Sequence, residues 1–131
     1  MRSDDRSLRV RVLLVEDYAV GLSAAQRALS LAFSVAAVSS GVEALGRVRG
    51  YPGAFDVVLA DFRMPEMTGI ELLEHLRLLE PRMRRVLMSC AEVPGLIGYS
   101  AVGLVQGFLQ KPFDLQTARA VLHPESLASR P

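Results

Sequence analysis

The chain has 131 residues and a net charge of +1 at pH 7, and 50% of its residues are hydrophobic while 22% are charged. This length suits one domain with a core of its own, and the composition excludes a disordered chain and gives no general electrostatic reason to bind nucleic acid or a membrane. The one cysteine, Cys90, excludes an internal disulfide and suits a reducing, cytoplasmic compartment.

The first part of the chain alternates apolar runs of strand length with segments of helical periodicity. Residues 8–17 become fully apolar and then end in two acids, which is typical of a strand buried on both faces. The pattern then predicts a helix over 18–33, a short strand over 34–38 and a helix over 39–50 that opens with a capping-box pattern. Residues 55–61, FDVVLAD, predict another buried strand. The helical spacing over 18–33 is carried by Val20, Ala24, Ala28 and Leu31, with Leu22, Ala25 and Leu29 beside them.

The middle of the chain repeats this alternation. A second capping-box pattern, TGIE, predicts a helix over 68–80 that ends at Pro81. Residues 84–90 predict the next apolar strand. The arginines at its start, in PRMRR (81–85), are expected to lie in a solvated loop, and they do not by themselves indicate a DNA contact.

An uncharged stretch over 93–110 has to be weighed as a membrane span, which needs about 20 apolar residues. The stretch contains one proline, two glutamines and four glycines. A glycine-rich helix around 94–104 followed by a buried strand over 105–110 accounts for it better. A last helix, capped by Asp114, follows Pro112.

Five strand–helix pairs in succession predict an α/β domain with a parallel sheet covered on both faces. Right-handed crossovers favour a doubly wound, flavodoxin-like (βα)5 three-layer sandwich with the strand order 2-1-3-4-5. We expect one domain over residues 8–123, with loose segments at 1–7 and 124–131.

Polar side chains follow the carboxyl ends of four of these strands. Parallel strands end at the same edge of a sheet, and open α/β sheets bind ligands there. Each side chain alone has an ordinary explanation, since an acid before a helix is often an N-cap. Their joint position at successive strand ends nevertheless predicts a single site. Its members are Glu16, Asp17, Asp61, Ser89 and Lys111.

Three carboxylates at one edge repel one another, and a divalent cation relieves that repulsion. Oxygen ligands without histidine or cysteine favour Mg²⁺ or Mn²⁺ over zinc. A carboxylate can also accept a phosphoryl group as an acyl phosphate, and phosphoryl transfer depends mostly on positioning and charge neutralisation. Since Thr68 rather than Asp61 is placed to cap the next helix, the Asp61 carboxylate is open to react.

Four motifs, LLVED, VVLADFRMPEMTG, VLMSCA and FLQKPF, together resemble the receiver domain of two-component response regulators, the CheY-like superfamily. The resemblance extends from about Leu8 to His123. It implies a phosphoacceptor at Asp61, a metal site made of Glu16, Asp17, Asp61 and the backbone carbonyl of Arg63, a switch hydroxyl at Ser89, a switch aromatic at Phe108, a site lysine at Lys111 and a cis bond between Lys111 and Pro112.

The resemblance implies a signalling module rather than an enzyme. The module would take a phosphoryl group from a histidine kinase or a phosphotransfer protein with Mg²⁺, and its own catalysis would be self-phosphorylation and slow self-dephosphorylation. Phosphorylation would draw Ser89 inward, turn Phe108 into the vacated space and alter an output surface over 93–113. That surface would contact an output partner or a second copy of the chain. The apolar residues expected to be exposed on it are Leu96, Tyr99 and Leu104.

Three other interpretations remain open. A Mg²⁺-dependent aspartyl-phosphate phosphatase or phosphotransferase commonly has an acid two residues after its nucleophile, where this chain has Arg63. A flavodoxin-like cofactor binder needs phosphate-cradling glycines in its first loop, where VEDYAVG carries two acids. A receiver that binds partners without phosphorylation is the third. Cys90 is expected to be a small buried thiol, and His75 and His123 are expected to be solvated.

Overall fold

Five parallel strands form a single sheet in the computed structural model, which describes residues 9–123. Their order is β2-β1-β3-β4-β5, so the predicted flavodoxin-like fold is confirmed. The segments expected to be loose lie outside the described residues. The strands are β1 (Arg11–Val15), β2 (Ser34–Val38), β3 (Val57–Asp61), β4 (Arg84–Ser89) and β5 (Gly107–Gln110). The helices are α1 (Ala19–Leu29), α2 (Gly41–Gly50), α3 (Gly69–Leu79), α4 (Leu96–Ala101) and α5 (Leu115–Leu122).

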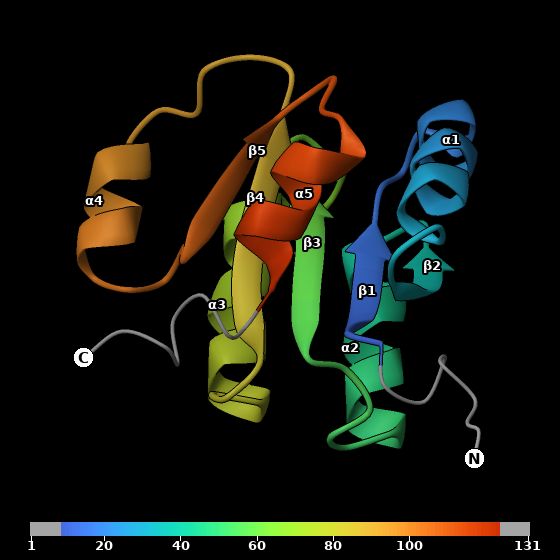
Figure 1. Ribbon diagram of the computed structural model, residues 1–131. Coiled ribbons are helices and arrows are strands. Elements are labelled where there is room, and N and C mark those ends of the chain that lie inside the picture. The colour runs from blue at the N-terminus through green and yellow to red at the C-terminus, as the bar shows by residue number, and fades with distance from the viewer. Residues whose placement is uncertain (1–8, 124–131) are drawn as a thin grey trace, which may run out of the picture.

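Helices cover both faces of the sheet (Figure 1). α1 and α5 pack on one face, and α2 and α3 pack on the other. Alternate residues of the central strands enter the two cores: Leu13 and Val58 face α2 and α3, whereas Val12 and Val57 face α1 and α5. The middle residues of these strands are apolar because both faces of the sheet are covered there.

Side-chain hydrogen bonds cap the first turns of α3 and α2, where the sequence predicted that helices begin. At α3, Thr68 Oγ1 accepts from the Glu71 N–H at 3.2 Å and Glu71 Oε1 accepts from the Thr68 N–H at 2.9 Å, which completes the predicted capping box. At α2, Ser40 Oγ accepts from the Glu43 N–H at 3.1 Å. The Glu43 carboxylate, however, accepts from the Ser39 N–H, one residue earlier than a capping box requires.

α1 carries apolar residues on two faces, and only one of them packs on the sheet. Leu22, Ala25 and Leu29 contact the core. On the other face, Val20 is 67% exposed and Ala24 and Ala28 are also exposed, and Leu31, two residues past the end of the helix, is 73% exposed. Helical spacing alone could not choose between the two faces, because both have the same period.

The expectation of a solvated arginine cluster at the start of β4 is wrong for two of its members. Arg84 and Arg85 are 7% and 3% exposed. Their guanidinium groups donate to backbone carbonyls of the segments that precede β5 and end α5. Hydrogen bonds to carbonyls compensate the loss of water around the buried cations.

α4 is shorter than predicted, with six helical residues instead of a helix around 94–104. The expected set of exposed apolar residues is also wrong in part: Leu96 and Tyr99 are half-buried and Leu104 is only 4% exposed, whereas Ile97 is 88% and Val102 is 63% exposed. No helix among residues 9–123 has the length and apolar character to cross a membrane.

A close approach at Gly69 brings the start of α3 against the end of β3. A Cβ atom at this position would lie 2.5 Å from the Asp61 carbonyl oxygen and 2.7 Å from Leu87 Cδ1. The Gly69 N–H also donates to the Phe62 carbonyl at 2.9 Å. Only glycine leaves room for this contact, which fixes the backbone on both sides of the loop after Asp61.

Replacing Gly69 with alanine should therefore lower the free energy of unfolding by about 2–3 kcal/mol, because the new methyl group overlaps backbone atoms. Gly46→Ala in α2 is the matched control, since an added Cβ there has no neighbour within 4 Å. Gly46→Ala should raise the free energy of unfolding by about 0.5–1 kcal/mol. Urea unfolding of both variants tests the pair, and equal effects would contradict the packing argument.

Candidate functional site

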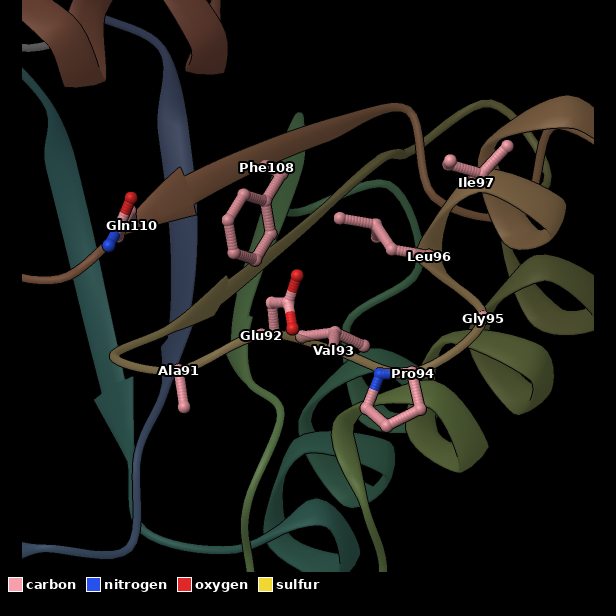
Figure 2. A pocket seen from close by; sticks show the side chains of 9 residues that line it. All are labelled: Ala91, Glu92, Val93, Pro94, Gly95, Leu96, Ile97, Phe108 and Gln110. Carbon is pink, nitrogen blue, oxygen red and sulfur yellow. The ribbon is translucent and has the colours of Figure 1, made fainter.

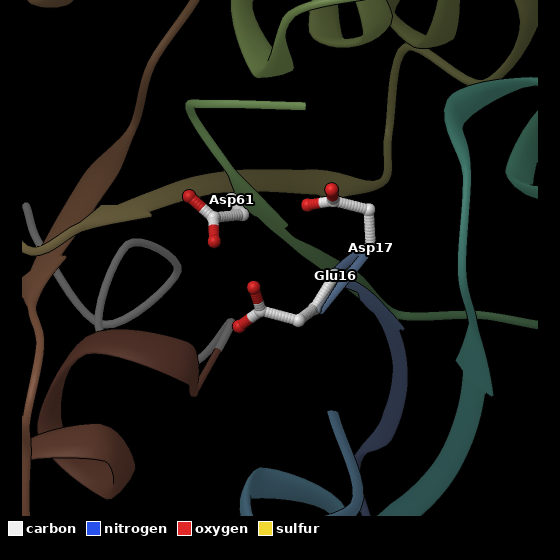
Figure 3. A group of neighbouring side chains, drawn as sticks. All are labelled: Glu16, Asp17 and Asp61. Carbon is white, nitrogen blue, oxygen red and sulfur yellow. The ribbon is translucent and has the colours of Figure 1, made fainter. Parts of the chain in front are cut away.

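Three carboxylates meet at the carboxyl edge of the sheet, as the sequence predicted (Figure 3). Glu16 and Asp17 directly follow β1, and Asp61 is the last residue of its neighbour β3. One oxygen from each lies within 4.8 Å of the others. Glu16 and Asp61 are buried, at 3% and 6% exposed, whereas Asp17 is exposed.

Lys111 completes this cluster from the loop after β5. Its Nζ lies 2.7 Å from Asp61 Oδ2 and 2.9 Å from Glu16 Oε1, so one ammonium group bridges two buried carboxylates. The bond between Lys111 and Pro112 is cis, as the resemblance implied. The Lys111 N–H donates to the Ser89 carbonyl at 2.9 Å, which ties the loop to the end of β4.

Ser89 and Phe108 lie on the neighbouring strands β4 and β5. Ser89 ends β4, is 1% exposed, and its Oγ accepts from the Ala91 N–H at 3.2 Å. Phe108, in β5, is half-buried and borders a hollow of about 590 Å³ between β5 and the segment that leads into α4. Figure 2 shows Leu96 and Phe108 facing each other across this hollow. The structure thus gives the Phe108 ring free space next to it.

The loop from β3 to α3 holds backbone groups at Asp61. The Arg63 N–H donates to Asp61 Oδ1 at 3.2 Å, which places the Arg63 backbone beside the carboxylate. Farther along, Glu66 has a φ of 71°, and the Met67 N–H donates to the Pro65 carbonyl at 2.7 Å across it. A left-handed conformation costs a residue with a side chain about 1–2 kcal/mol. The sequence signalled a turn through its Met-Pro step but not this conformation of Glu66.

Of the two buried carboxylates, the electrostatics favour the negative charge on Asp61. Burial, reinforced by a hydrogen bond to Asp61, raises the pKa of Glu16 to about 7 against the opposing effect of Lys111. Burial also works to raise the pKa of Asp61, but hydrogen bonds from Glu16 and Lys111 outweigh it and lower that pKa. The same two carboxylates raise the pKa of Lys111 although burial lowers it. Asp61 is therefore an anion near neutral pH, while Glu16 lies close to its midpoint.

Three further residues, Cys90, His75 and His123, make none of the contacts described above. Cys90 is exposed, so the expectation of a buried thiol is wrong. His123 is half-buried with its ring 5.7 Å from that of Phe33, so it is not simply solvated. His75 is exposed, as expected.

The donor set suits a hard divalent cation. It consists of carboxylate oxygens, one of them exposed, and the backbone of the β3–α3 loop lies next to them. A lysine beside a carboxylate also suits a phosphoryl group, because the cation neutralises charge on the phosphoryl oxygens. The geometry can therefore hold a cation and a phosphoryl group at Asp61.

Comparison with known proteins identifies the family. The model described as the response regulator receiver domain matches residues 12–123. The chain belongs to the response regulator receiver domain family. This receiver domain is 34% identical over 116 residues to the sensor kinase CckA of Brucella abortus, with 88% of this chain and 12% of that protein covered. It is 37% identical over 123 residues to a two-component response regulator of Oryza sativa, with 83% of this chain and 53% of that protein covered.

Solved structures agree with this assignment. Chemotaxis protein CheY4 of Vibrio cholerae matches with a TM-score of 0.74 and 26% identity, over 92% of this chain and 98% of that chain. A structure described as an adenylate cyclase from Rhodopirellula baltica matches with a TM-score of 0.76 and 31% identity, over 86% of this chain and 83% of that chain. The receiver domain spans about half or less of the two curated relatives described above. It is a signalling module of two-component systems.

The raised pKa of Glu16 predicts how stability depends on pH in the metal-free protein. Folding raises the pKa of Glu16 from 4.5 to about 7, so the folded state holds a proton that the unfolded chain releases. Stability should therefore fall as the pH rises between these values, by on the order of 1–3 kcal/mol. The lowered pKa of Asp61 acts elsewhere, since its contribution is lost only as the pH falls below about 3.8. Urea midpoints at pH 5 and pH 7 should show a smaller fall in Glu16→Gln than in wild type; identical falls would contradict the assignment.

Proposed function

We propose that this receiver domain is a phosphoacceptor in a two-component phosphorelay, with Asp61 as the residue that is phosphorylated. The observation that carries the proposal is the Asp61 carboxylate, held 2.7 Å from Lys111 Nζ beside two further carboxylates. The phosphoryl donor would be a histidine kinase or a phosphotransfer protein. The same proposal places the domain over residues 8–123 and in the cytoplasm, where its single cysteine suits a reducing environment.

Glu16, Asp17, Asp61 and the Arg63 carbonyl would hold Mg²⁺, or Mn²⁺, in this proposal. The bound cation would neutralise charge between the carboxylates and the incoming phosphoryl group. The proton that Glu16 keeps close to neutral pH has to leave before that carboxylate can bind a cation at full charge. The Lys111 ammonium group already contacts both buried carboxylates, so it can stay hydrogen-bonded to whichever of them keeps the greater negative charge.

In the transfer step, an Asp61 oxygen attacks the phosphorus atom of the donor phosphohistidine. The new bond joins that oxygen to phosphorus, the nitrogen–phosphorus bond breaks, and the electron pair returns to the imidazole ring. Lys111 stabilises the negative charge of the transferred group. The Arg63 N–H orients the carboxylate by donating to Asp61 Oδ1 at 3.2 Å, whereas Lys111 contacts Oδ2.

Ser89 and Phe108 would form the switch. Ser89 Oγ accepts one hydrogen bond from the Ala91 N–H, so its own proton can be donated to a phosphoryl oxygen. Movement of Ser89 and of the chain after it would change the hollow beside Phe108, whose ring is only half-buried. The surface over 93–113 would then bind an output partner or a second copy of the domain differently in the two states.

The exposed face of α1 supports a helical protein donor. α1 begins two residues after Asp17, and the exposed apolar side chains along it include Val20 and, two residues past its end, Leu31. Tyr18, directly before the helix, is 64% exposed. A helix that packs along this face would bring its phosphohistidine to Asp61, which lies beside Asp17 near the N-terminal end of α1.

The alternatives have less support. A phosphatase or phosphotransferase of the aspartyl-phosphate type would need an acid near Asp61 in place of the exposed Arg63. A receiver that works without phosphorylation would not need the lysine and the three carboxylates together. Self-phosphorylation and slow self-dephosphorylation are the only catalysis proposed.

Phosphorylation can be tested with a small phosphodonor such as acetyl phosphate and Mg²⁺. We expect one phosphoryl adduct on the intact protein, stable in acid and labile in base, and none on Asp61→Asn. Asp114→Asn is the matched control, because asparagine also caps a helix and Asp114 lies outside the site. An adduct that persists in Asp61→Asn, or its absence from wild type, would overturn the proposal.

The donor surface has its own test. The donor is the kinase that phosphorylates the wild type fastest in a panel of purified kinases. A charge at Val20 in α1, or at Leu31 two residues past its end, should slow phosphotransfer from this kinase by about tenfold or more in Val20→Asp or Leu31→Asp. The reason is that the new charge must be desolvated on docking. The rate with acetyl phosphate should not change. Leu78→Asp, on α3 and 83% exposed in the wild type, is the control. Equal transfer rates in all three variants would show that the donor docks elsewhere.

A further inference from the structure

The C-terminal end of α4 is closed by a Schellman motif. Gly103 has a φ of 77°, its N–H donates to the Ser100 carbonyl at 3.1 Å, and the Leu104 N–H donates to the Tyr99 carbonyl at 3.0 Å. These are the two bonds that define the motif, and its left-handed position favours glycine. The motif turns the chain toward β5 and satisfies carbonyls of the last helical turn.

The three carbonyls that follow α4 accept bonds from two arginines. Arg77 Nη2, from α3, donates to the Val102 carbonyl at 3.1 Å. Arg85, from β4, donates through Nη2 to the Gly103 carbonyl and through Nε to the Leu104 carbonyl, each at 2.9 Å. We call Arg77 and Arg85 with these three carbonyls the arginine clamp.

Arg85 is built into the core rather than resting on the surface. It is 3% exposed, and its Nη1 also donates to the Met83 carbonyl at 3.3 Å. Burial, and to a lesser extent the nearby charge of Arg77, lowers the pKa of Arg85. Two like charges are therefore held together at the carboxyl end of a helix, where the partial negative charge of the helix dipole favours cations.

The N-terminal end of α4 lacks such hydrogen bonds and is held by apolar packing, since Val93 is 7% exposed in the core and Leu96 packs half-buried against it. α4 contains no buried side chain, and its N-cap is Gly95, which makes no side-chain cap. The hollow of about 590 Å³ separates this end from Phe108, and the helix stands away from the sheet (Figures 1 and 2). The chain from Val93 to Gln110 has no charged side chain that could hold this end by an ion pair.

We infer that Arg77 and Arg85 are positioning residues that fix the C-terminal end of α4 and the start of β5, and so confine movement of α4 to its N-terminal end and the hollow beside Phe108. A displacement that starts at Ser89 reaches this end first, through the loop over 90–95. α4 then moves as a lever whose C-terminal end is held in place by the arginine clamp. The role in switching rests on the proposed phosphorylation of Asp61, whereas the fixation of one end of α4 does not.

Hydrogen exchange followed by mass spectrometry tests the fixation in the unphosphorylated protein. Arg77→Met removes one donor from a surface position, so the fold should survive even if variants of the buried Arg85 do not. We expect exchange of the amides over 102–105 to rise about three- to tenfold in Arg77→Met, the effect of losing one hydrogen bond from a charged donor. Arg77→Lys should restore part of the protection, because an ammonium group can still donate to the Val102 carbonyl. Arg82→Met, in the exposed loop before β4, is the matched control and should leave these amides unchanged.

The lever is tested by the same measurement with Mg²⁺ and acetyl phosphate. In wild type, phosphorylation should alter exchange over 91–98 by at least about threefold and leave 102–105 unchanged. In Arg77→Met the alteration should extend into 102–105, and Arg77→Lys should confine it again. A clamp that only stabilised the fold would raise exchange in both segments alike, with or without phosphorylation.

Two outcomes overturn the inference. One is unchanged exchange over 102–105 in Arg77→Met relative to Arg82→Met. The other is a wild type in which phosphorylation alters 102–105 as strongly as 91–98. Intact mass of the same samples separates this inference from the proposed function: no phosphoryl adduct means that phosphoacceptance fails, whereas an adduct without the confined change means that the lever fails.

Discussion

The ammonium group of Lys111 lies between two buried carboxylates, and the site depends on that contact. Asp61 and Glu16 are held together by the edge of the sheet, where their charges would repel and their burial would be costly. Lys111 relieves the repulsion with one cation, and Glu16 relieves the rest by keeping a proton close to neutral pH. The third carboxylate, Asp17, is exposed.

The backbone around Asp61 is held by tight packing and by local strain. Gly69 lets the start of α3 approach the Asp61 carbonyl too closely for any side chain, and the left-handed Glu66 bends the intervening loop. The Arg63 N–H then reaches the carboxylate. Strain of this kind persists only where the surrounding structure over-determines the conformation, and here the capping box of α3 and the strand β3 hold the two ends of the loop.

The two faces of the molecule that border the site are held differently. α1 rests on the core through one face and leaves a second apolar face exposed beside Asp17. α4 is held at its C-terminal end by hydrogen bonds from Arg77 and Arg85, whereas its N-terminal end is held by apolar packing of Val93 and Leu96. In the proposed function, a donor would meet a helix packed on the core, whereas the output surface would include a segment held at one end by apolar packing alone.

The sequence by itself determined the strand–helix order, the capping box of α3 and the meeting of Glu16, Asp17, Asp61 and Lys111. These follow from local patterns and from the shared edge of parallel strands. Only the tertiary structure decided which face of α1 packs, since both faces are apolar at the same period. Only it showed that Arg84 and Arg85 are buried and that Cys90 is exposed. Burial of a charge depends on carbonyls that distant segments supply, and no local pattern encodes those partners.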